Sequence, residues 1–162
     1  MEQAIIAIGS NLGNRLGMIR KAADFLERIS VEKIKKSSIW ESEPLGPARY
    51  KFLNCAALMT TEWTPAELLH RLKGFEKECG RDPGADRWAP RILDLDIIRF
   101  GEQIVQTGDL VIPHPEFMNR LFVLLPVQEI FNGYIDPSKP ISGEEYILNA
   151  PAMGINKTDL KW

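Results

Sequence analysis

Two aspartates interrupt an otherwise apolar run near the middle of the chain, in RWAPRILDLDII (residues 87–98). Aspartate is disfavoured in strands, so Asp94 and Asp96 in a strand-like run need a reason beyond the fold. Alternate residues of a strand face one side, which would place the two β-carbons about 6–7 Å apart. Carboxylates in this arrangement suit Mg²⁺, which takes one or two of them together with substrate phosphates. The spacing therefore predicts a magnesium site.

Three arginines precede the two carboxylates, at Arg81, Arg87 and Arg91. A guanidinium group holds phosphate oxygens through paired hydrogen bonds. Cation-binding carboxylates beside anion-binding arginines are typical of phosphoryl transfer from a magnesium nucleotide. The alternative is that arginines and aspartates pair with each other on a solvated edge strand. Trp88 in the same loop favours a ligand site, because a loop aromatic often serves as a stacking surface.

Three other segments have residue types that suit ligand binding. The turn GSNLG (residues 9–13) can offer backbone N–H groups to an anion, although it matches no phosphate-loop motif and an ordinary turn is the alternative. The loop PLGP (residues 44–47), with Phe52 and Asn54 after it, can shape a pocket for a flat ring. There an aromatic side chain would stack and the amide would offer a donor and an acceptor, unless these are ordinary core residues.

The histidines and cysteines carry weaker signals. His114 lies between two prolines and shortly before Arg120, so it is the better placed histidine, with a structural role as the alternative. His70 falls within an expected helix and is predicted to lie on the surface. Cys55 and Cys79 are far apart and form neither a metal motif nor a disulfide framework.

These residues must be positioned by a small set of helices and strands. A capping box opens the clearest helix, with Thr64 as the N-cap, Pro65 at the first helical position and Glu67 closing the box. Elsewhere, apolar spacing, glycines and prolines mark the boundaries. We expect strands over residues 4–8, 33–42, 52–61 and 93–100, and helices over residues 16–30, 64–79, 116–131 and 142–149.

The order strand, helix, strand, strand, helix, strand is that of the ferredoxin-like βαββαβ fold. This α+β fold has an antiparallel sheet with both helices on one face, which leaves the other face for a ligand or for the C-terminal extension. The length of 162 residues suits a single domain over residues 1–162. The fold hosts enzymes, RNA-binding modules and regulatory modules, so function depends on the site.

Composition excludes several classes of function. The 20 basic and 22 acidic residues give a net charge of −2, which lacks the basic excess of nucleic-acid or anionic-membrane binders. No apolar run is long enough to span a bilayer, and the N-terminus lacks the basic residues of a signal peptide. We therefore expect a cytoplasmic protein with small-molecule substrates and neither nucleic acid nor a membrane as partner.

Taken together, the motifs resemble the 6-hydroxymethyl-7,8-dihydropterin pyrophosphokinase family of folate biosynthesis. The most specific part is the run from Arg87 to Ile98. The resemblance extends over nearly the whole chain and also includes IGSN (residues 8–11), EPLG (43–46), FLN (52–54), Glu76, Arg81, PHP (113–115) and RLFVL (120–124).

Membership implies a ferredoxin-like fold and an ATP-dependent transfer of pyrophosphate to the pterin's hydroxymethyl oxygen, with AMP released. The resemblance implies two Mg²⁺ ions, both held by Asp94 and Asp96, and it makes Arg81 and Arg91 catalytic groups that grip the phosphates. Charge on three phosphates must be neutralised in such a reaction, which two metals and the arginines would do. The expected ATP-binding residues are Lys73, Glu76, Arg81, Arg91, Ile97, His114 and Arg120.

The resemblance also implies a pterin site. The ring would lie between Phe52 and Phe122, with Asn54 reading its amide edge, and Trp88 would close over the ligands to exclude water. The expected pterin-binding residues are Pro44, Leu45, Gly46, Phe52, Asn54, Trp88, Asp94 and Phe122. A monomer is expected, because members of this family need not form oligomers.

Four positions depart from patterns seen in some members of the family. Pro83 and Asp109 stand where basic residues can occur, Pro115 replaces an aromatic residue, and Ala89 replaces a common glycine. These changes bear on ATP affinity and loop closure rather than on the reaction. Two other hypotheses remain: a non-catalytic ferredoxin-like module that binds RNA or a small regulatory ligand, and a different Mg²⁺-dependent phosphotransferase or hydrolase.

Overall fold

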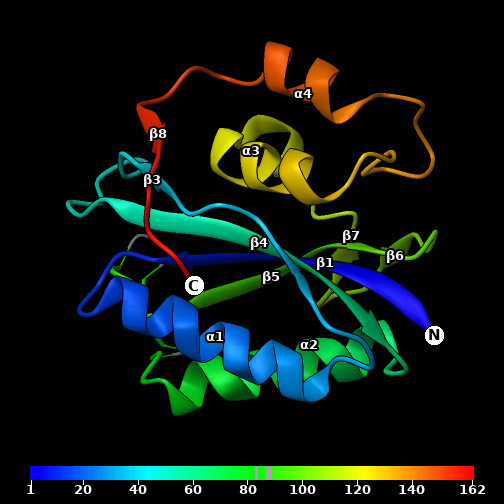
Figure 1. The fold of residues 1–162 in the computed structure, drawn as a ribbon, viewed down its shortest axis with the longest axis horizontal. Helices are drawn as coiled ribbons and strands as arrows, with labels where there is room; N and C mark the ends of the chain where they lie inside the picture. Colours follow the sequence, from blue (N-terminus) through cyan, green and yellow to red (C-terminus); the bar gives the residue numbers. More distant parts are fainter. Residues whose placement is uncertain (83, 87–88) are drawn as a thin grey trace.

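The sheet at the centre of the molecule is antiparallel throughout, with strand order β5-β1-β4-β3-β8 and with β2 also paired to β4 (Figure 1). The computed structural model describes residues 1–82, 84–86 and 89–162. Its sheet strands are β1 (Glu2–Ser10), β2 (Lys35–Lys36), β3 (Trp40–Ser42), β4 (Phe52–Thr61), β5 (Asp94–Phe100) and β8 (Ile155–Lys157). A separate hairpin joins β6 (Val105–Gln106) to β7 (Val111–Ile112).

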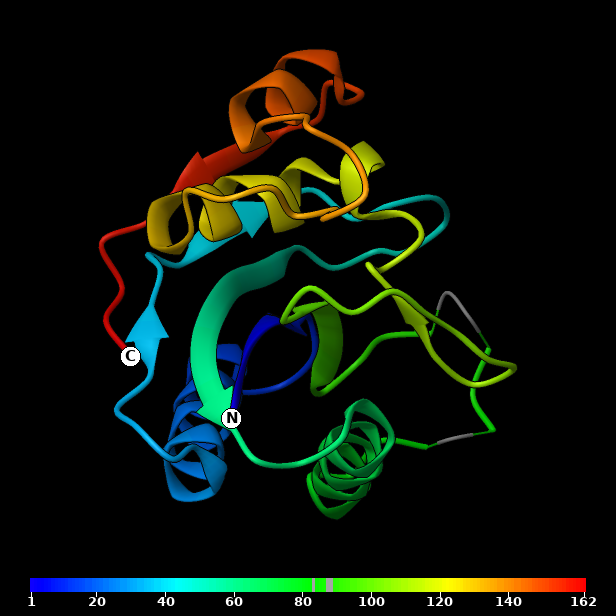
Figure 2. The ribbon, with the colours of Figure 1, turned by 90° about the vertical axis from the view of Figure 1, so that its right-hand side faces the viewer.

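Two helical layers cover the sheet from opposite sides, as Figure 2 shows. α1 (Arg15–Ile29) and α2 (Pro65–Glu78) lie on one face, and α3 (Leu121–Ile130) and α4 (Gly143–Asn149) lie on the other. The order from β1 to β5, with both early helices on one face, confirms the predicted ferredoxin-like fold. The C-terminal part then adds α3, α4 and β8 to it.

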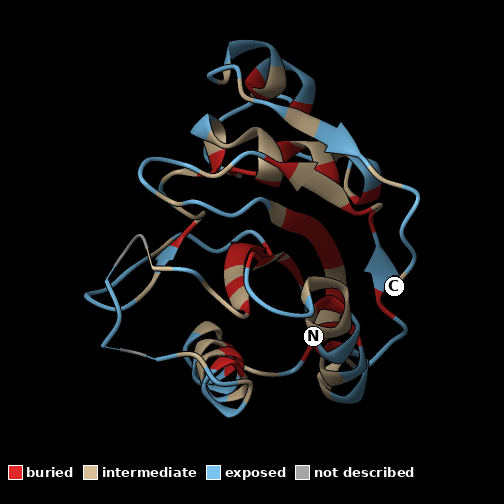
Figure 3. Cartoon of the chain, turned by 90° about the vertical axis from the view of Figure 1, so that its left-hand side faces the viewer, coloured by how far each residue is buried: buried red, intermediate tan, exposed pale blue. Residues whose placement is uncertain are grey.

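Each face of the sheet has its own apolar core, visible as the buried parts of strands and inner helix surfaces in Figure 3. Strand alternation sorts the side chains: Ile6 and Ile8 of β1 pack toward α1 and α2, whereas Ile5 packs toward α3. Phe25 of α1 and Phe75 of α2 stack with ring centroids 4.1 Å apart, which joins the two helices. The α3 face is covered by apolar side chains only in part, and its remainder forms the site described below.

Helix starts follow the predicted capping chemistry. The Thr64 hydroxyl accepts a hydrogen bond from the Glu67 N–H, and the Glu67 carboxylate accepts one from the Thr64 N–H, so the capping box is confirmed. Ser142 caps α4 through the Glu145 N–H, and that helix ends at Asn149 as expected. Both cysteines are free.

Two predicted elements were wrong in their extent. The strand expected over residues 33–42 is two short strands, β2 and β3. At the break, the Ser37 N–H donates to the Ala56 carbonyl, and the Ala56 N–H donates to the Ser37 hydroxyl rather than to a backbone carbonyl. A serine side chain therefore takes one place in the ladder, and the strand pairing stops there.

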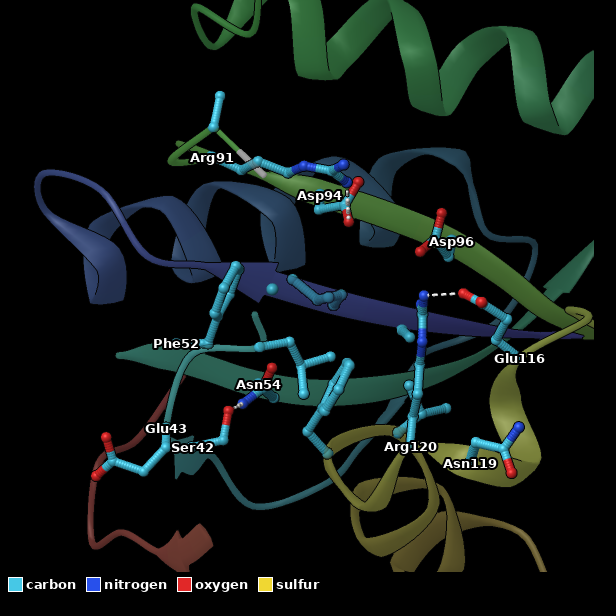
Figure 4. Close-up of a pocket in the computed structure, with 17 residues that line it drawn as sticks. Ser42, Glu43, Phe52, Asn54, Arg91, Asp94, Asp96, Glu116, Asn119 and Arg120 are labelled. Carbon is cyan, nitrogen blue, oxygen red and sulfur yellow. Dashed lines mark hydrogen bonds and ion pairs between the residues drawn. The ribbon is translucent and has the colours of Figure 1, made fainter. Parts of the chain in front are cut away.

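The helix expected over residues 116–131 is also interrupted. A 3₁₀ turn covers Phe117–Asn119, and α3 begins only at Leu121, because Arg120 between them has an extended backbone (φ −123°, ψ 95°). Because of this break, the Arg120 side chain is not part of a continuous helix face and points toward the sheet (Figure 4). No helix in the described part of the chain is long and apolar enough to cross a membrane.

Candidate active site

A pocket of about 300 Å³ lies on the α3 face, where the sheet is not covered by apolar side chains (Figure 4). Strands β1, β4 and β5 form its floor, and the segment entering α3 forms one wall. Its lining consists of Ala7, Ile8, Gly9, Ser42, Glu43, Leu45, Phe52, Asn54, Ala89, Arg91, Asp94, Asp96, Glu116, Asn119, Arg120, Phe122 and Val123. Charged groups gather at the β5 side and aromatic groups at the β4 side.

The strand register explains how the two sides face each other. Gly9 on the central strand β1 pairs with Asp94 of β5 on one side and with Asn54 of β4 on the other. Two residues earlier in β1, Ala7 pairs with Asp96 of β5 and with Ala56 of β4. Two strand spacings separate the Asp94 and Asn54 backbones by about 10 Å. Small residues therefore form a shallow floor between the carboxylates and the amide.

The two aspartates lie among cations from three different segments. Asp94 accepts from Arg81 at 2.9 Å and from Arg91 at 2.8 Å, using one carboxylate oxygen for each. Asp96 lies 3.6 Å from the Lys73 ammonium nitrogen and 3.9 Å from His114 Nε2. Arginine–aspartate pairing, the alternative considered from the sequence, thus does occur. It occurs on β5, which is an edge strand of the sheet, but Asp94 lines the pocket and its side chain is only 20% exposed.

Their surroundings make the two carboxylates unequal. Burial alone would raise the pKa of Asp94, but Arg91, Lys73 and Arg81 outweigh it and lower the pKa. Burial and the neighbouring charge of Asp94 raise the pKa of Asp96. Burial likewise lowers the pKa of His114. Carboxylates whose pKa values are pushed apart are typical of functional sites.

Glu76 supports this charged cluster from below the sheet. Its side chain is 1 % exposed, and one carboxylate oxygen accepts from the Leu95 N–H at 2.6 Å and from Lys73 at 2.8 Å. The other oxygen accepts from Arg81. Burial raises the pKa of Glu76. Because Leu95 lies between the two aspartates, this single carboxylate fixes β5, Lys73 and Arg81 relative to one another.

The donor set fits magnesium rather than a closed structural metal site. The described residues contain no group of three or more histidine, cysteine or carboxylate side chains that would hold a metal by themselves. Asp94 and Asp96 supply two hard oxygen ligands, and Mg²⁺ commonly takes one or two carboxylates with substrate phosphates and water.

At the other end of the pocket, Asn54 is held in one orientation. Its amide nitrogen donates to the Ser42 hydroxyl oxygen at 2.8 Å and to the Trp40 carbonyl at 3.3 Å. The amide oxygen therefore faces the pocket, between Phe52 and the floor at Gly9 (Figure 4). A buried acceptor next to an aromatic ring suits a flat ligand whose edge carries N–H groups.

Arg120 stands between the charged and aromatic ends. It forms an ion pair with Glu116, and its guanidinium carbon is 5.7 Å from the centre of the Phe122 ring (Figure 4). The Glu116 N–H donates to His114 Nδ1 at 3.2 Å. His114, Arg120 and the Phe122 ring thus come from one segment that faces the sheet.

The structure gathers most of the predicted site residues in or beside this pocket. Leu45, Phe52, Asn54, Arg91, Asp94, Asp96, Arg120 and Phe122 line it. Lys73, Glu76, Arg81 and His114 contact the two aspartates or their partners without lining it. Ile97 packs in the core toward α1 and α2. Pro44 and Gly46 lie in the loop before β4 but outside the lining, and Trp88 lies outside the described residues.

Several lining residues were missed by sequence reasoning, notably Ser42, Glu116 and Asn119, and Gly9 was named only as part of a possible anion-binding turn although it lies in β1. Ser42 and Gly9 gain their place through strand register, which no local motif encodes. The spacing of Glu116 four residues before Arg120 was a usable signal, since opposite charges at this distance often pair.

Comparison with known proteins places the chain in a family. A family model described as 7,8-dihydro-6-hydroxymethylpterin-pyrophosphokinase (HPPK) matches residues 5–132. The 2-amino-4-hydroxy-6-hydroxymethyldihydropteridine pyrophosphokinase of Bacillus subtilis is 42% identical over 129 residues, covering 78% of this chain and 77% of the relative. The protein of the same name from Haemophilus influenzae is 37% identical over 146 residues, covering 89% and 91%.

Larger relatives match over part of their length. The chain is 37% identical to a folate synthesis bifunctional protein of Arabidopsis thaliana and spans 27% of it. Among solved structures, HPPK-DHPS in complex with substrates matches with a TM-score of 0.68, 14% identity and coverage of 91% of this chain and 43% of that one. Plasmodium falciparum HPPK-DHPS matches with a TM-score of 0.70 and 13% identity, covering 91% and 44%. The chain belongs to the 7,8-dihydro-6-hydroxymethylpterin-pyrophosphokinase family.

Proposed function

We propose that the pocket brings MgATP and 6-hydroxymethyl-7,8-dihydropterin together, with the nucleotide at the β5 side and the pterin at the β4 side. As a member of its family, the chain transfers a pyrophosphoryl group from ATP to the pterin in folate biosynthesis. The observation that carries the assignment of sides is the row Asp94–Gly9–Asn54 across three neighbouring strands. Its span of about 10 Å suits a bicyclic ring whose edge meets Asn54 and whose hydroxymethyl group reaches toward Asp94.

In this proposal each end of the pocket has its own task. Phe52 and Phe122 stack on the ring, and Asn54 accepts from its N–H edge. Arg81 and Arg91 leave Asp94 to hold phosphate oxygens, and Arg120 adds a third cation at the junction of the two substrates. Magnesium held by Asp94 and Asp96 supplies charge neutralisation on the polyphosphate.

The chemistry then rests mainly on positioning. Phosphoryl-type transfer gains most from alignment of the attacking and leaving oxygens and from charge stabilisation. The stacked ring holds the hydroxymethyl oxygen in line with the β-phosphorus of ATP. Attack by this oxygen forms its bond to the β-phosphorus and breaks the bond from the β-phosphorus to the oxygen that bridges to the α-phosphorus, so AMP leaves and the hydroxyl proton is released to solvent.

The number of metal ions, the oligomeric state and the cellular location are further proposals. We propose two Mg²⁺ ions held by Asp94 and Asp96, as the resemblance to the family implies. We also propose a monomer that works in the cytoplasm. ATP and the pterin are its small-molecule partners.

A product assay tests the reaction. The protein is incubated with MgATP, with and without 6-hydroxymethyl-7,8-dihydropterin, and the nucleotides are separated. We expect AMP to form in proportion to the pterin diphosphate, and only when the pterin is present. Release of ADP and phosphate would instead indicate another Mg²⁺-dependent phosphotransferase or hydrolase, and no turnover would contradict the proposal.

A further inference from the structure

Gly9 occupies a position in β1 where the backbone does not require glycine. It lies in the middle of the antiparallel pairing with both β4 and β5. The chain's glycines with positive φ are Gly13, Gly46, Gly80 and Gly101, and Gly9 is not among them. Glycine weakens a strand interior, so its presence there often marks a place where a ligand or another backbone approaches closely.

Packing within the protein does not require glycine at this position either. A β-carbon built on Gly9 would lie 3.6 Å from Phe52 Cδ1 and 3.8 Å from Asn54 Oδ1, both ordinary contact distances. By contrast, a β-carbon on Gly17 would lie 2.6 Å from the Asn14 side chain. An alanine therefore fits at position 9 without moving any neighbour, and its methyl group would project into the pocket that Gly9 lines.

The space above Gly9 also contains an unused hydrogen-bond acceptor. Asn54 is only 3 % exposed, and both interactions of its amide are donated by the nitrogen, to Ser42 and to Trp40. Within the described part of the chain, nothing donates to its Oδ1. An acceptor that faces the pocket and accepts no hydrogen bond from the described residues is available to a ligand.

We propose that Gly9 is a specificity-determining residue of the ring site. Its missing side chain lets the N–H-bearing edge of a planar heteroaromatic ring pass beside Phe52 and reach Asn54 Oδ1. A methyl group at position 9 would occupy the space this edge needs, while the charged end of the pocket would keep its contacts. This inference rests on the proposed function, in which that ring is the pterin.

The test compares Gly9→Ala with Gly74→Ala. Gly74 lies in α2, where an added β-carbon has nothing within 4 Å, so this control adds the same methyl group in open space. Binding of 6-hydroxymethyl-7,8-dihydropterin is measured by calorimetry in the presence of Mg²⁺ and a non-hydrolysable ATP analogue, and binding of that MgATP analogue is measured alone. For Gly9→Ala we expect the pterin Kd to rise by about tenfold or more, as for the loss of one buried hydrogen bond. The Kd for the MgATP analogue and the melting temperature of Gly9→Ala should stay within the range measured for Gly74→Ala.

A double variant separates blocking of the Asn54 contact from a general disturbance. If Gly9→Ala acts by keeping the ring from Asn54, its effect on the pterin Kd should be several-fold smaller in an Asn54→Ala background. An unchanged pterin Kd in Gly9→Ala, an equal loss of nucleotide binding, or an equal effect in both backgrounds would overturn the inference. If the wild-type protein bound no pterin, the proposed function itself would fail, so the two failures are distinguishable.

Discussion

Asp94 and Asp96 show how single side chains are made unequal by their neighbours. Both lie on the same face of β5, yet Asp94 is paired with two arginines, whereas Asp96 faces a lysine and a histidine at longer distances. The pKa of the first is lowered and that of the second is raised. Two adjacent carboxylates repel each other, so each depends on the positively charged groups around it.

Replacing either aspartate by asparagine should remove activity without unfolding the protein. Asp94→Asn and Asp96→Asn each delete a proposed metal ligand, and metal stabilisation of developing charge contributes several kcal/mol. We expect AMP formation to fall by about a hundredfold or more. Steady-state assays at saturating MgATP and pterin measure this change, with melting temperature as the check on folding.

The exposed Asp159 near the C-terminus provides the matched control. Asp159→Asn makes the same chemical change far from the pocket lining and should leave turnover unchanged. Near-normal activity in both Asp94→Asn and Asp96→Asn would mean that these carboxylates only balance the charge of the arginines.

For single residues, the sequence predicted the kind of chemistry better than it predicted which side chains contact one another. A run with Asp94, Asp96 and nearby arginines is readable because aspartate is rare in strands. The roles of Ser42 and Gly9 were not readable, because each acts only through the residue that strand pairing places opposite it. Glu76 was predicted by resemblance to the family as an ATP-binding residue, which stays a prediction; its contacts with β5 and Lys73 were not predicted.

The boundaries of helices and strands depend partly on local residues and partly on contacts with distant ones. Capping residues and glycines are local, so the starts of α2 and α4 were predictable. The backbone of Arg120 is extended between the 3₁₀ turn and α3. The other departure is caused by tertiary hydrogen bonds, because Ser37 enters the β4 ladder in place of a longer strand. Propensity cannot predict such breaks, because the partners are far away in sequence.

Glu129 of α3 connects the second helical layer to β3. Its carboxylate accepts from the Ser38 N–H at 2.9 Å and from Trp40 Nε1 at 2.7 Å. Burial alone would raise its pKa, but these hydrogen bonds and nearby Lys157 outweigh burial and lower the pKa below its ordinary 4.5. Its ionised form therefore favours the folded state, by an amount present above the unfolded pKa and lost as the pH falls through the folded pKa.

The pH dependence of stability should reveal this contribution. Glu129→Gln should be less stable than the wild type at pH 7, and the difference should shrink as the pH falls from about 5 to 3, because the wild-type carboxylate becomes protonated. Melting temperatures of both proteins over this range provide the measurement. The exposed Glu144 offers a control, Glu144→Gln, for loss of a carboxylate outside this contact. A difference that stays constant with pH would contradict the assignment.

Across the whole molecule, the two ends of the pocket are supported from opposite faces of the sheet. The charged end rests on α2, through Glu76 and Lys73 under β5. The aromatic end rests on α3 and on β3, which is itself held between β4 and β8. The backbone N–H of Glu43, next to the pocket residue Ser42, donates to the Gly154 carbonyl, so the C-terminal segment also supports the aromatic end of the pocket. The two supports share no side-chain contact among the described residues.

This separation predicts that the supports can be weakened independently. Glu76→Gln removes a charge that orients Lys73 and Arg81, so it should raise the KM for MgATP by about tenfold, as expected for loss of a charge-assisted hydrogen bond. Glu129→Gln loosens β3 and should raise the KM for the pterin by about threefold, with little change for MgATP. Sites that share no partners combine additively, within about 0.5 kcal/mol. The double variant should therefore show the product of the two single effects in kcat/KM, and a clear departure from that product would mean that the sheet couples the two ends.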